Sequence, residues 1–474
     1  MINSSFLDFK NKIFEFFQNL FAPLVENSFI LSRIDDVIMF FIALTLIGSA
    51  FLESEKIGLL AIIVIALTLI KLLIKKGAKI QLFSFDGALI LYFAICLIST
   101  FNSELLLQSV HGFLKTVIYI FYYFCAANYF QTNQNKIRYF FLLIGTLCLT
   151  ESVIAIYQNM CGVEQISTWQ DVNYINPEDA LSRAYGTLKP LNPNLLGGYL
   201  IAGISCIIAA GMNCLFQKKY KTFSYSLISF ASCMLAIFFT GCRGAYLAIG
   251  AIIAGFVVIF TKLLLSEFKG TNETSRKVKR YWGGFLGILA GLFALILIAV
   301  PQISKRLMSI FILRTDSSTS FRMNVYNSSW QMFKDNWILG IGTGNQTFRE
   351  IYGLYMVSGY DALSTYSVPL EIAVEAGIFA LLAFGAFIVM FLIHSIRFIS
   401  ASNDQNKLPE KVIVACTILT VIGVMAHGLF DTIFFRPQVQ FLFWTIIAIT
   451  SSIFYNNAVS EQGETGERTE NDTN

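Results

Sequence analysis

Apolar runs of membrane-spanning length dominate this sequence. A helix that crosses the hydrocarbon core needs about 20 mostly apolar residues. Of the 474 residues 55% are hydrophobic and only 14% are charged, which excludes a soluble globular or a disordered chain. We therefore expect an all-α, polytopic integral membrane protein with about 12 transmembrane helices. The expected spans are residues 37–53, 57–74, 85–101, 110–130, 139–157, 195–215, 223–240, 245–265, 282–300, 366–394, 412–430 and 438–456.

The basic residues of the loops predict the orientation. With a cytoplasmic N-terminus, the inner segments carry 22 Lys and Arg and the outer segments carry 11. An excess on the cytoplasmic side is the usual pattern in membrane proteins, so both termini are expected in the cytoplasm. The overall net charge of +4 is too small to indicate nucleic acid as a partner.

Five regions follow from this topology. Residues 1–36 are expected to form a cytoplasmic amphipathic segment on the membrane surface, because Phe6, Phe9, Ile13, Phe16, Phe17 and Leu20 recur at helical spacing. Residues 37–300 hold the first nine spans, 301–365 a large periplasmic loop, and 366–456 the last three spans. Residues 457–474 are expected to be a disordered acidic tail.

The outer basic residues differ in kind from the inner ones. Seven of the 11 outer residues are Arg, whereas 16 of the 22 inner ones are Lys. The planar guanidinium suits bidentate contact with phosphate or carboxylate. The alternative is that these arginines only pair with loop carboxylates.

Ionisable residues also occur inside the spans, where an unpaired charge is costly. Lys115 and Glu151 lie in the outer third of neighbouring spans and are expected to pair. Glu371 and Glu375 are one helical turn apart near the outer end of the tenth span. His427 ends the eleventh span, with Asp431 four residues and Arg436 nine residues later. The cysteines have no metal-ligand spacing, so no metal or other cofactor is expected.

Over residues 85–456 the chain resembles the O-antigen ligase and polymerase superfamily, whose members have the GT-C type glycosyltransferase fold. The resemblance depends on five stretches in order. They are Arg183 to Asn194, Thr240-Gly241-Cys242-Arg243-Gly244-Ala245, Ser320-Phe321-Arg322 with Trp330, Gly340-Ile341-Gly342-x-Gly344-Asn345-x-x-Phe348, and Tyr366-Ser367 followed by Gly377.

The resemblance implies an enzyme of lipopolysaccharide or polysaccharide biosynthesis. Such a ligase moves a glycan from a polyprenyl-pyrophosphate carrier to an acceptor at the outer face of the bacterial cytoplasmic membrane, without a metal. By position, Arg243 and Arg322 would bind the pyrophosphate, and Arg183 and Arg436 are further outer arginines that could bind it. The catalytic histidine of the family is replaced by Tyr366, so Glu371, Glu375 and His427 are candidates for the missing base.

A second resemblance leaves an alternative open. Leu363-Ser364-x-Tyr366-Ser367-x-Pro369-Leu370-Glu371, with His427-Gly428-Leu429-Phe430-Asp431-Thr432 and Arg436-Pro437-Gln438, is similar to the IctB-type membrane proteins. These are described as bicarbonate transporters. The same arginines would bind bicarbonate or another small anion, and a non-catalytic relative that has lost the base is a third possibility. The sequence does not predict the oligomeric state.

Overall fold

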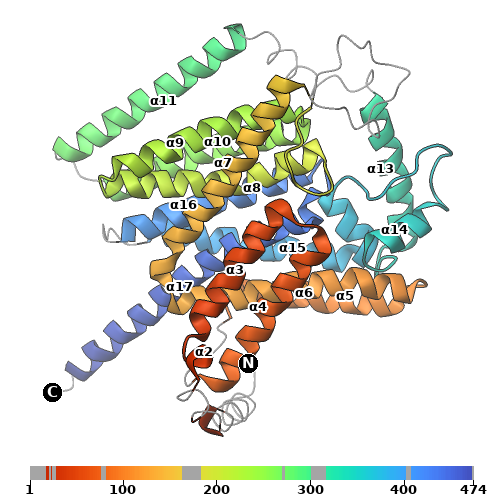
Figure 1. The fold of residues 1–474 in the computed structure, drawn as a ribbon, viewed down its shortest axis with the longest axis horizontal. Helices are drawn as coiled ribbons and strands as arrows, with labels where there is room; N and C mark the ends of the chain where they lie inside the picture. Colours follow the sequence, from red (N-terminus) through yellow and green to blue (C-terminus); the bar gives the residue numbers. More distant parts are fainter. Residues whose placement is uncertain are drawn as a thin grey trace.

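The computed structural model describes residues 18–20, 23, 28–75, 82–162, 183–268, 273–299, 317–401 and 407–471, and within these ranges every regular element is a helix (Figure 1). The helices of more than one turn are α2 Phe29–Ser32, α3 Ile34–Phe51, α4 Ser54–Ile74, α5 Ser84–Asn102, α6 Leu106–Thr132, α7 Ile137–Cys161, α8 Pro193–Phe216, α9 Tyr220–Thr240, α10 Arg243–Glu267, α11 Glu273–Ala299, α13 Ser317–Asp335, α14 Asn345–Tyr352, α15 Val368–Ser400, α16 Leu408–Gly428 and α17 Pro437–Asn471. Two short 3-10 turns, η1 Gln134–Lys136 and η4 Ile433–Phe435, connect helices.

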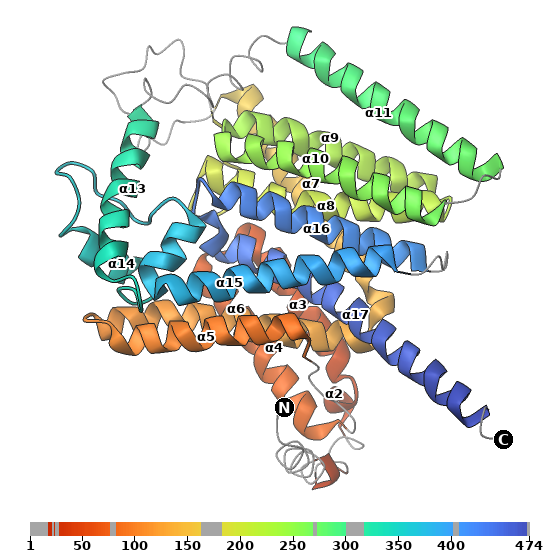
Figure 2. The ribbon, with the colours of Figure 1, turned by 180° about the vertical axis from the view of Figure 1, so that it is seen from behind.

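The all-α polytopic prediction is confirmed. Eleven of the described helices are long and apolar enough to cross a membrane, namely α3 to α10 and α15 to α17. Each corresponds to one expected span. The remaining expected span, 282–300, corresponds to α11, which lies at one side of the bundle (Figure 2) and contacts α10 through a hydrogen bond from Trp282 to Thr261. Part of that helix has side chains outside the described set.

The middle of the bundle is formed by α8, α16 and α17, which are the most enclosed of the spans. The helix α17 is polar for such a position, and its hydroxyl groups bond to neighbouring helices. Thr450 bonds to Thr417 at 2.7 Å, and Thr445 bonds to Tyr122 at 2.9 Å. Hydrogen bonds between helices are a recognised source of association in lipid, where apolar burial contributes little.

Loops that are distant in the sequence meet at one end of the bundle. The backbone amide of Ala184 donates to Phe239, the hydroxyl of Thr187 donates to the carbonyl of Ala50, and Gln438 donates to the carbonyl of Lys189. All these residues lie in segments that the predicted topology places outside. At the opposite end Glu267 pairs with Lys411, and both side chains are only 2% exposed. The alternation of the spans therefore agrees with the prediction, while the cytoplasmic location of the termini stays a prediction.

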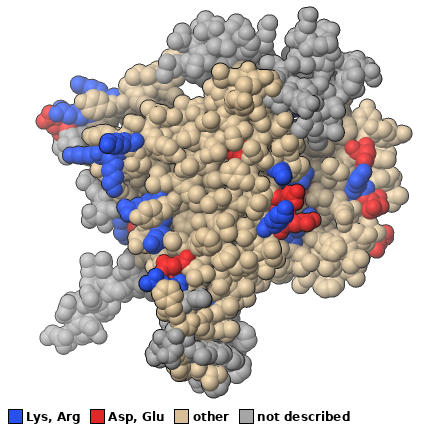
Figure 3. Space-filling model, in the orientation of Figure 1, with Lys and Arg blue, Asp and Glu red and all other residues tan. Residues whose placement is uncertain are grey.

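Charged side chains gather at the ends of the helices on the face in Figure 3, with an uncharged band between them. Lys and Arg predominate on the left, where α9 and α10 begin or end, and both signs are mixed on the right, near α13 and α14. This distribution is the one expected when a lipid-facing belt separates two aqueous surfaces.

The described part of the large loop, residues 317–365, is folded against the bundle through α13 and α14. Val325 and Met332 are buried, whereas Trp330 and Trp337 are about half exposed. Between the two helices lies the glycine turn, in which Gly340, Gly342 and Gly344 all have positive φ. Positive φ is open to glycine without a steric penalty, which explains the glycine-rich motif here.

Two expectations concern the chain ends. The amphipathic segment at residues 1–36 lies mostly outside the described residues. The segment from 457 onward was expected to be disordered, whereas α17 continues as a helix to Asn471.

Candidate functional site

Arg322 on α13 is held by three groups from two distant segments. One of its terminal nitrogens donates to the carbonyl of Phe430 at 2.7 Å, and the other lies 3.4 Å from Oδ2 of Asp431. Its guanidinium carbon lies 5.4 Å from the ring centre of Tyr366. The Arg322 side chain is still 26% exposed, so these contacts do not bury it completely.

The first turn of α8 supplies the partner of Asp431. Asn192 caps α8 by accepting from the amide of Asn194, and Pro193 occupies the first helical position, where its missing N–H is not needed. The side-chain nitrogen of Asn194 then donates to Oδ2 of Asp431 at 2.9 Å. Both an arginine and an amide therefore donate to one carboxylate oxygen.

Arg183 completes this arrangement. Its Nε donates to the carbonyl of Thr240 at 2.8 Å, and a terminal nitrogen donates to Oδ1 of Asn194 at 2.7 Å. We call Arg183, Asn194, Asp431 and Arg322 the arginine network. Arg183 holds Asn194 in the orientation that presents its NH₂ to Asp431.

His427 lies beside the network at the end of α16. Its Nε2 is 3.5 Å from the Sγ of Cys242, which immediately precedes α10, and both residues are only 3% exposed. Burial raises the pKa of the Cys242 thiol, but the adjacent His427 outweighs this effect and holds that pKa below its usual value. Arg243 is the next residue and opens α10, so the contact brings Arg243 to the same end of the bundle.

Tyr366 lies in the segment Ser364–Ser367, which we call the strap. It is one of two described non-glycine residues with positive φ, at 55°. Such conformations are uncommon and concentrate at functional sites. Burial, with a smaller contribution from Asp431, raises the pKa of Tyr366 to about 12. The phenol is therefore neutral at physiological pH and cannot act there as a general base.

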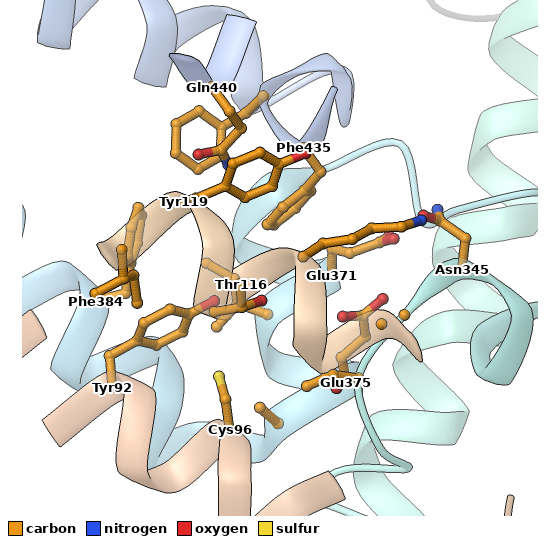
Figure 4. Close-up of a pocket in the computed structure, with 18 of the residues that line it drawn as sticks. Tyr92, Cys96, Thr116, Tyr119, Asn345, Glu371, Glu375, Phe384, Phe435 and Gln440 are labelled. Atoms are coloured by element: carbon orange, nitrogen blue, oxygen red, sulfur yellow. The ribbon is translucent and has the colours of Figure 1, made fainter. Parts of the chain in front are cut away.

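The structure thus brings four of the eight expected site residues together, Arg183, Arg322, Tyr366 and His427, and places Arg243 at the same end of the bundle. Glu371 and Glu375 instead line a pocket on the other side of the strap, together with Lys115 (Figure 4). Arg436, which precedes α17, is close enough to Glu371 to interact with it electrostatically.

The expected pair of Lys115 and Glu151 is wrong. The carboxylate of Glu151 accepts hydrogen bonds from the backbone amide and the hydroxyl of Thr187. These two donors belong to the loop before α8 and satisfy Glu151 without a cation. No carboxylate among the described residues pairs directly with Lys115.

Asp431 and Asn194 are central to the network, yet neither was predicted as a site residue. Asn194 is part of the Asn-Pro-Asn motif, and Asp431 follows His427 by one helical turn, so both belonged to segments already singled out. Their mutual contact could not be predicted, because it joins segments 237 residues apart. No group of three or more His, Cys, Asp or Glu in the described part of the chain could hold a metal ion.

Comparison with known proteins adds one finding. No curated protein is a significant match to the chain. Residues 228–385 match the model of the O-antigen ligase family, and this region contains Arg243, Arg322, Tyr366 and the glycine turn. The match covers about a third of the chain. This multi-pass membrane protein is therefore similar, over its central region, to the O-antigen ligases.

Proposed function

We propose that this protein transfers a glycan from a polyprenyl-pyrophosphate carrier at the outer face of the bacterial cytoplasmic membrane, as a ligase or a polymerase. The main support is the position of Arg322, which lies between Tyr366 and Asp431 with part of its side chain exposed. The family match spans this arginine and Arg243. A membrane protein whose arginines gather where a lipid headgroup would lie suits a carrier-lipid substrate.

The chemistry needs charge stabilisation at the leaving group. The hydroxyl oxygen of the acceptor attacks the anomeric carbon of the carrier-linked sugar. The bond between that carbon and the pyrophosphate oxygen breaks, and the electron pair leaves with the pyrophosphate. Arg322 and Arg243 would stabilise the negative charge that develops there, because positioned guanidinium groups bind pyrophosphate oxygens in pairs.

The proton of the acceptor hydroxyl needs a base other than Tyr366. We assign this role to Asp431, which lies at the centre of the network and accepts hydrogen bonds from Asn194 and Arg322. These donors hold the carboxylate in one orientation, as a general base requires. His427 is the other titratable group beside the network, but its Nε2 faces Cys242.

Complementation of a deletion strain tests the proposed function. Cells that lack the protein are supplied with the wild type, Arg322→Ala or Arg349→Ala, and both cell-surface glycan and bicarbonate uptake are measured. Arg349 is the matched control, because it belongs to the same outer region but pairs with Asp361 on the exposed surface.

We expect Arg322→Ala to abolish the surface glycan and to leave bicarbonate uptake unchanged, while Arg349→Ala behaves as the wild type. Loss of uptake with an intact surface glycan would instead favour anion transport and overturn the proposal. A strain in which neither readout changes on deletion would also overturn it.

A further inference from the structure

The pocket that contains Glu371 and Glu375 lies across the strap from the arginine network. It is formed between the ends of α5, α6, α15 and α17 and is closed on one side by the turn at Thr343–Asn345. Its empty volume, including the open mouth, is about 740 Å³. In Figure 4 the carboxylates of Glu371 and Glu375 and the side chain of Asn345 lie along one side, and aromatic rings lie along the other.

Two polar groups that line this pocket make no hydrogen bond to any described residue. Tyr119 is only 8% exposed, and its hydroxyl makes no hydrogen bond to any described residue. Gln440 is 3% exposed and accepts from the indole of Trp444, while its NH₂ donates to nothing in the described chain. Neither atom is fully enclosed by the described protein, so both are open to the pocket and can bond to a polar ligand there.

The charges around the pocket nearly balance. Glu371 and Glu375 bring two carboxylates, and Lys115 brings an ammonium group. Arg436 adds a second positive charge that acts on Glu371. A ligand with a net charge of either sign would therefore gain little from the pocket as a whole, whereas a neutral molecule with many hydroxyl groups could use both the donors and the acceptors.

The remaining walls are flat and apolar. They are formed by the rings of Tyr92, Phe384, Phe434, Phe435 and Trp444. Aromatic faces carry partial negative charge and attract the C–H bonds on the face of a saturated ring. Apolar walls with a few placed polar groups are the usual composition of a small-molecule site. We propose that this pocket binds a neutral sugar ring, with its hydroxyls toward Glu371, Glu375, Tyr119 and Gln440.

The pocket is joined to the arginine network through the strap. The carboxylate of Glu371 accepts a 2.6 Å hydrogen bond from the amide of Thr365, and the next residue, Tyr366, contacts Arg322 with its ring. The strap would thus lie between a sugar in the pocket and the pyrophosphate leaving group. We assign this sugar to the acceptor glycan, and only that assignment rests on the proposed function.

The test is direct binding of simple sugars to the whole protein in nanodiscs. The probes are the methyl glycosides of glucose, galactose, rhamnose and N-acetylglucosamine, with choline and inorganic phosphate as charged comparisons. Binding is measured by saturation-transfer NMR. The variant is Tyr119→Phe, which removes only the unpartnered hydroxyl. The matched control is Tyr122→Phe on the same helix, whose hydroxyl bonds to Thr445 and does not face the pocket.

We expect at least one methyl glycoside to bind and neither charged probe to do so. Loss of one hydrogen bond should weaken that binding about three- to tenfold in Tyr119→Phe and leave it unchanged in Tyr122→Phe. Binding of no sugar, binding of a charged probe alone, or an equal affinity of wild type and Tyr119→Phe would each overturn the proposal.

Undecaprenyl pyrophosphate, titrated into the same nanodiscs, separates this proposal from the preceding one. Sugar binding without carrier binding would contradict the proposed function and leave the pocket assignment standing. Carrier binding without sugar binding would contradict only the pocket assignment. The expected result is that both ligands bind and that Tyr119→Phe affects the sugar alone.

Discussion

The side-chain nitrogen of Asn194 donates a 2.9 Å hydrogen bond to Oδ2 of Asp431, and this bond fixes the start of α8 to the loop that follows α16. The same carboxylate oxygen faces Arg322, and the carbonyl oxygen of the same Asn194 side chain accepts from Arg183. The Asn194 amide therefore links Arg183 to the carboxylate that Arg322 contacts directly. This link gives the carboxylate a fixed orientation at the place where the pyrophosphate is proposed to bind.

Replacement of Asp431 by Asn tests its role as the base. Asn keeps the shape of the side chain and can still accept from Arg322, but it cannot take up a proton. We expect surface glycan assembly to fall about 100-fold or more, while binding of undecaprenyl pyrophosphate is retained. Asp361→Asn, which changes the exposed partner of Arg349, is the control. Assembly within about threefold of the wild type in Asp431→Asn would show that the base lies elsewhere.

Replacement of Tyr366 by Phe tests the conclusion that this residue is not the base. Phe keeps the ring beside Arg322 and removes only the hydroxyl. Because the phenol is neutral below about pH 12, we expect the pH profile of transfer between pH 6 and 9 to keep its shape. A profile that loses its basic limb in Tyr366→Phe would contradict this assignment.

The raised pKa of Tyr366 also predicts an effect on stability. The folded protein holds the phenolic proton up to about pH 12, whereas the unfolded chain releases it near pH 10. This group therefore contributes its full stabilisation below pH 10 and loses it as the pH rises to 12. Over that range the melting temperature of Tyr366→Phe should fall less steeply than that of the wild type. Parallel slopes would show that the pKa is not raised.

The ion pair of Glu267 and Lys411 at the opposite end of the bundle is predicted to matter for stability alone. Both side chains are 2% exposed, so Glu267→Ala leaves a buried ammonium without its partner. A loss of about 3–5 kcal/mol is typical of such a change. The double variant Glu267→Leu with Lys411→Met should recover most of that loss. Thermal melting in detergent measures both the loss and its recovery. Removal of the exposed pair of Lys56 and Glu53 is the control and should change the stability little.

Hydropathy was sufficient to predict the spans, because each apolar run must form a helix to satisfy its backbone in lipid. The glycine turn was also predictable, since the three glycines of Gly340-Ile341-Gly342-Thr343-Gly344 all adopt positive φ. In contrast, the pairing of the charged side chains could not be predicted. Lys115 and Glu151 were expected at similar depths in the membrane. The sequence does not show how each helix is rotated about its axis, and therefore which neighbour each side chain faces.

In the candidate site, too, some residues could be predicted from the sequence and their contacts could not. Arg322, Arg243 and Tyr366 could be proposed from the resemblance of their motifs to those of the O-antigen ligases. The role of Asp431 depends on Asn194 and Arg322, which approach it from two other parts of the fold. Glu371 and Glu375 were predicted with His427 as candidate bases, but they line a pocket on the other side of the strap, and His427 does not. Contacts of this kind follow from tertiary packing and are absent from any local pattern.

The most direct test of the central claim is a titration of undecaprenyl pyrophosphate into the purified protein in nanodiscs. Wild type, Arg322→Ala, Arg243→Ala and the control Arg349→Ala are compared, with undecaprenyl monophosphate as the second ligand. The account predicts saturable binding of the pyrophosphate that is lost in Arg322→Ala and Arg243→Ala and kept in Arg349→Ala, with weaker binding of the monophosphate. No binding to the wild type, or equal binding to all four proteins, would contradict the account.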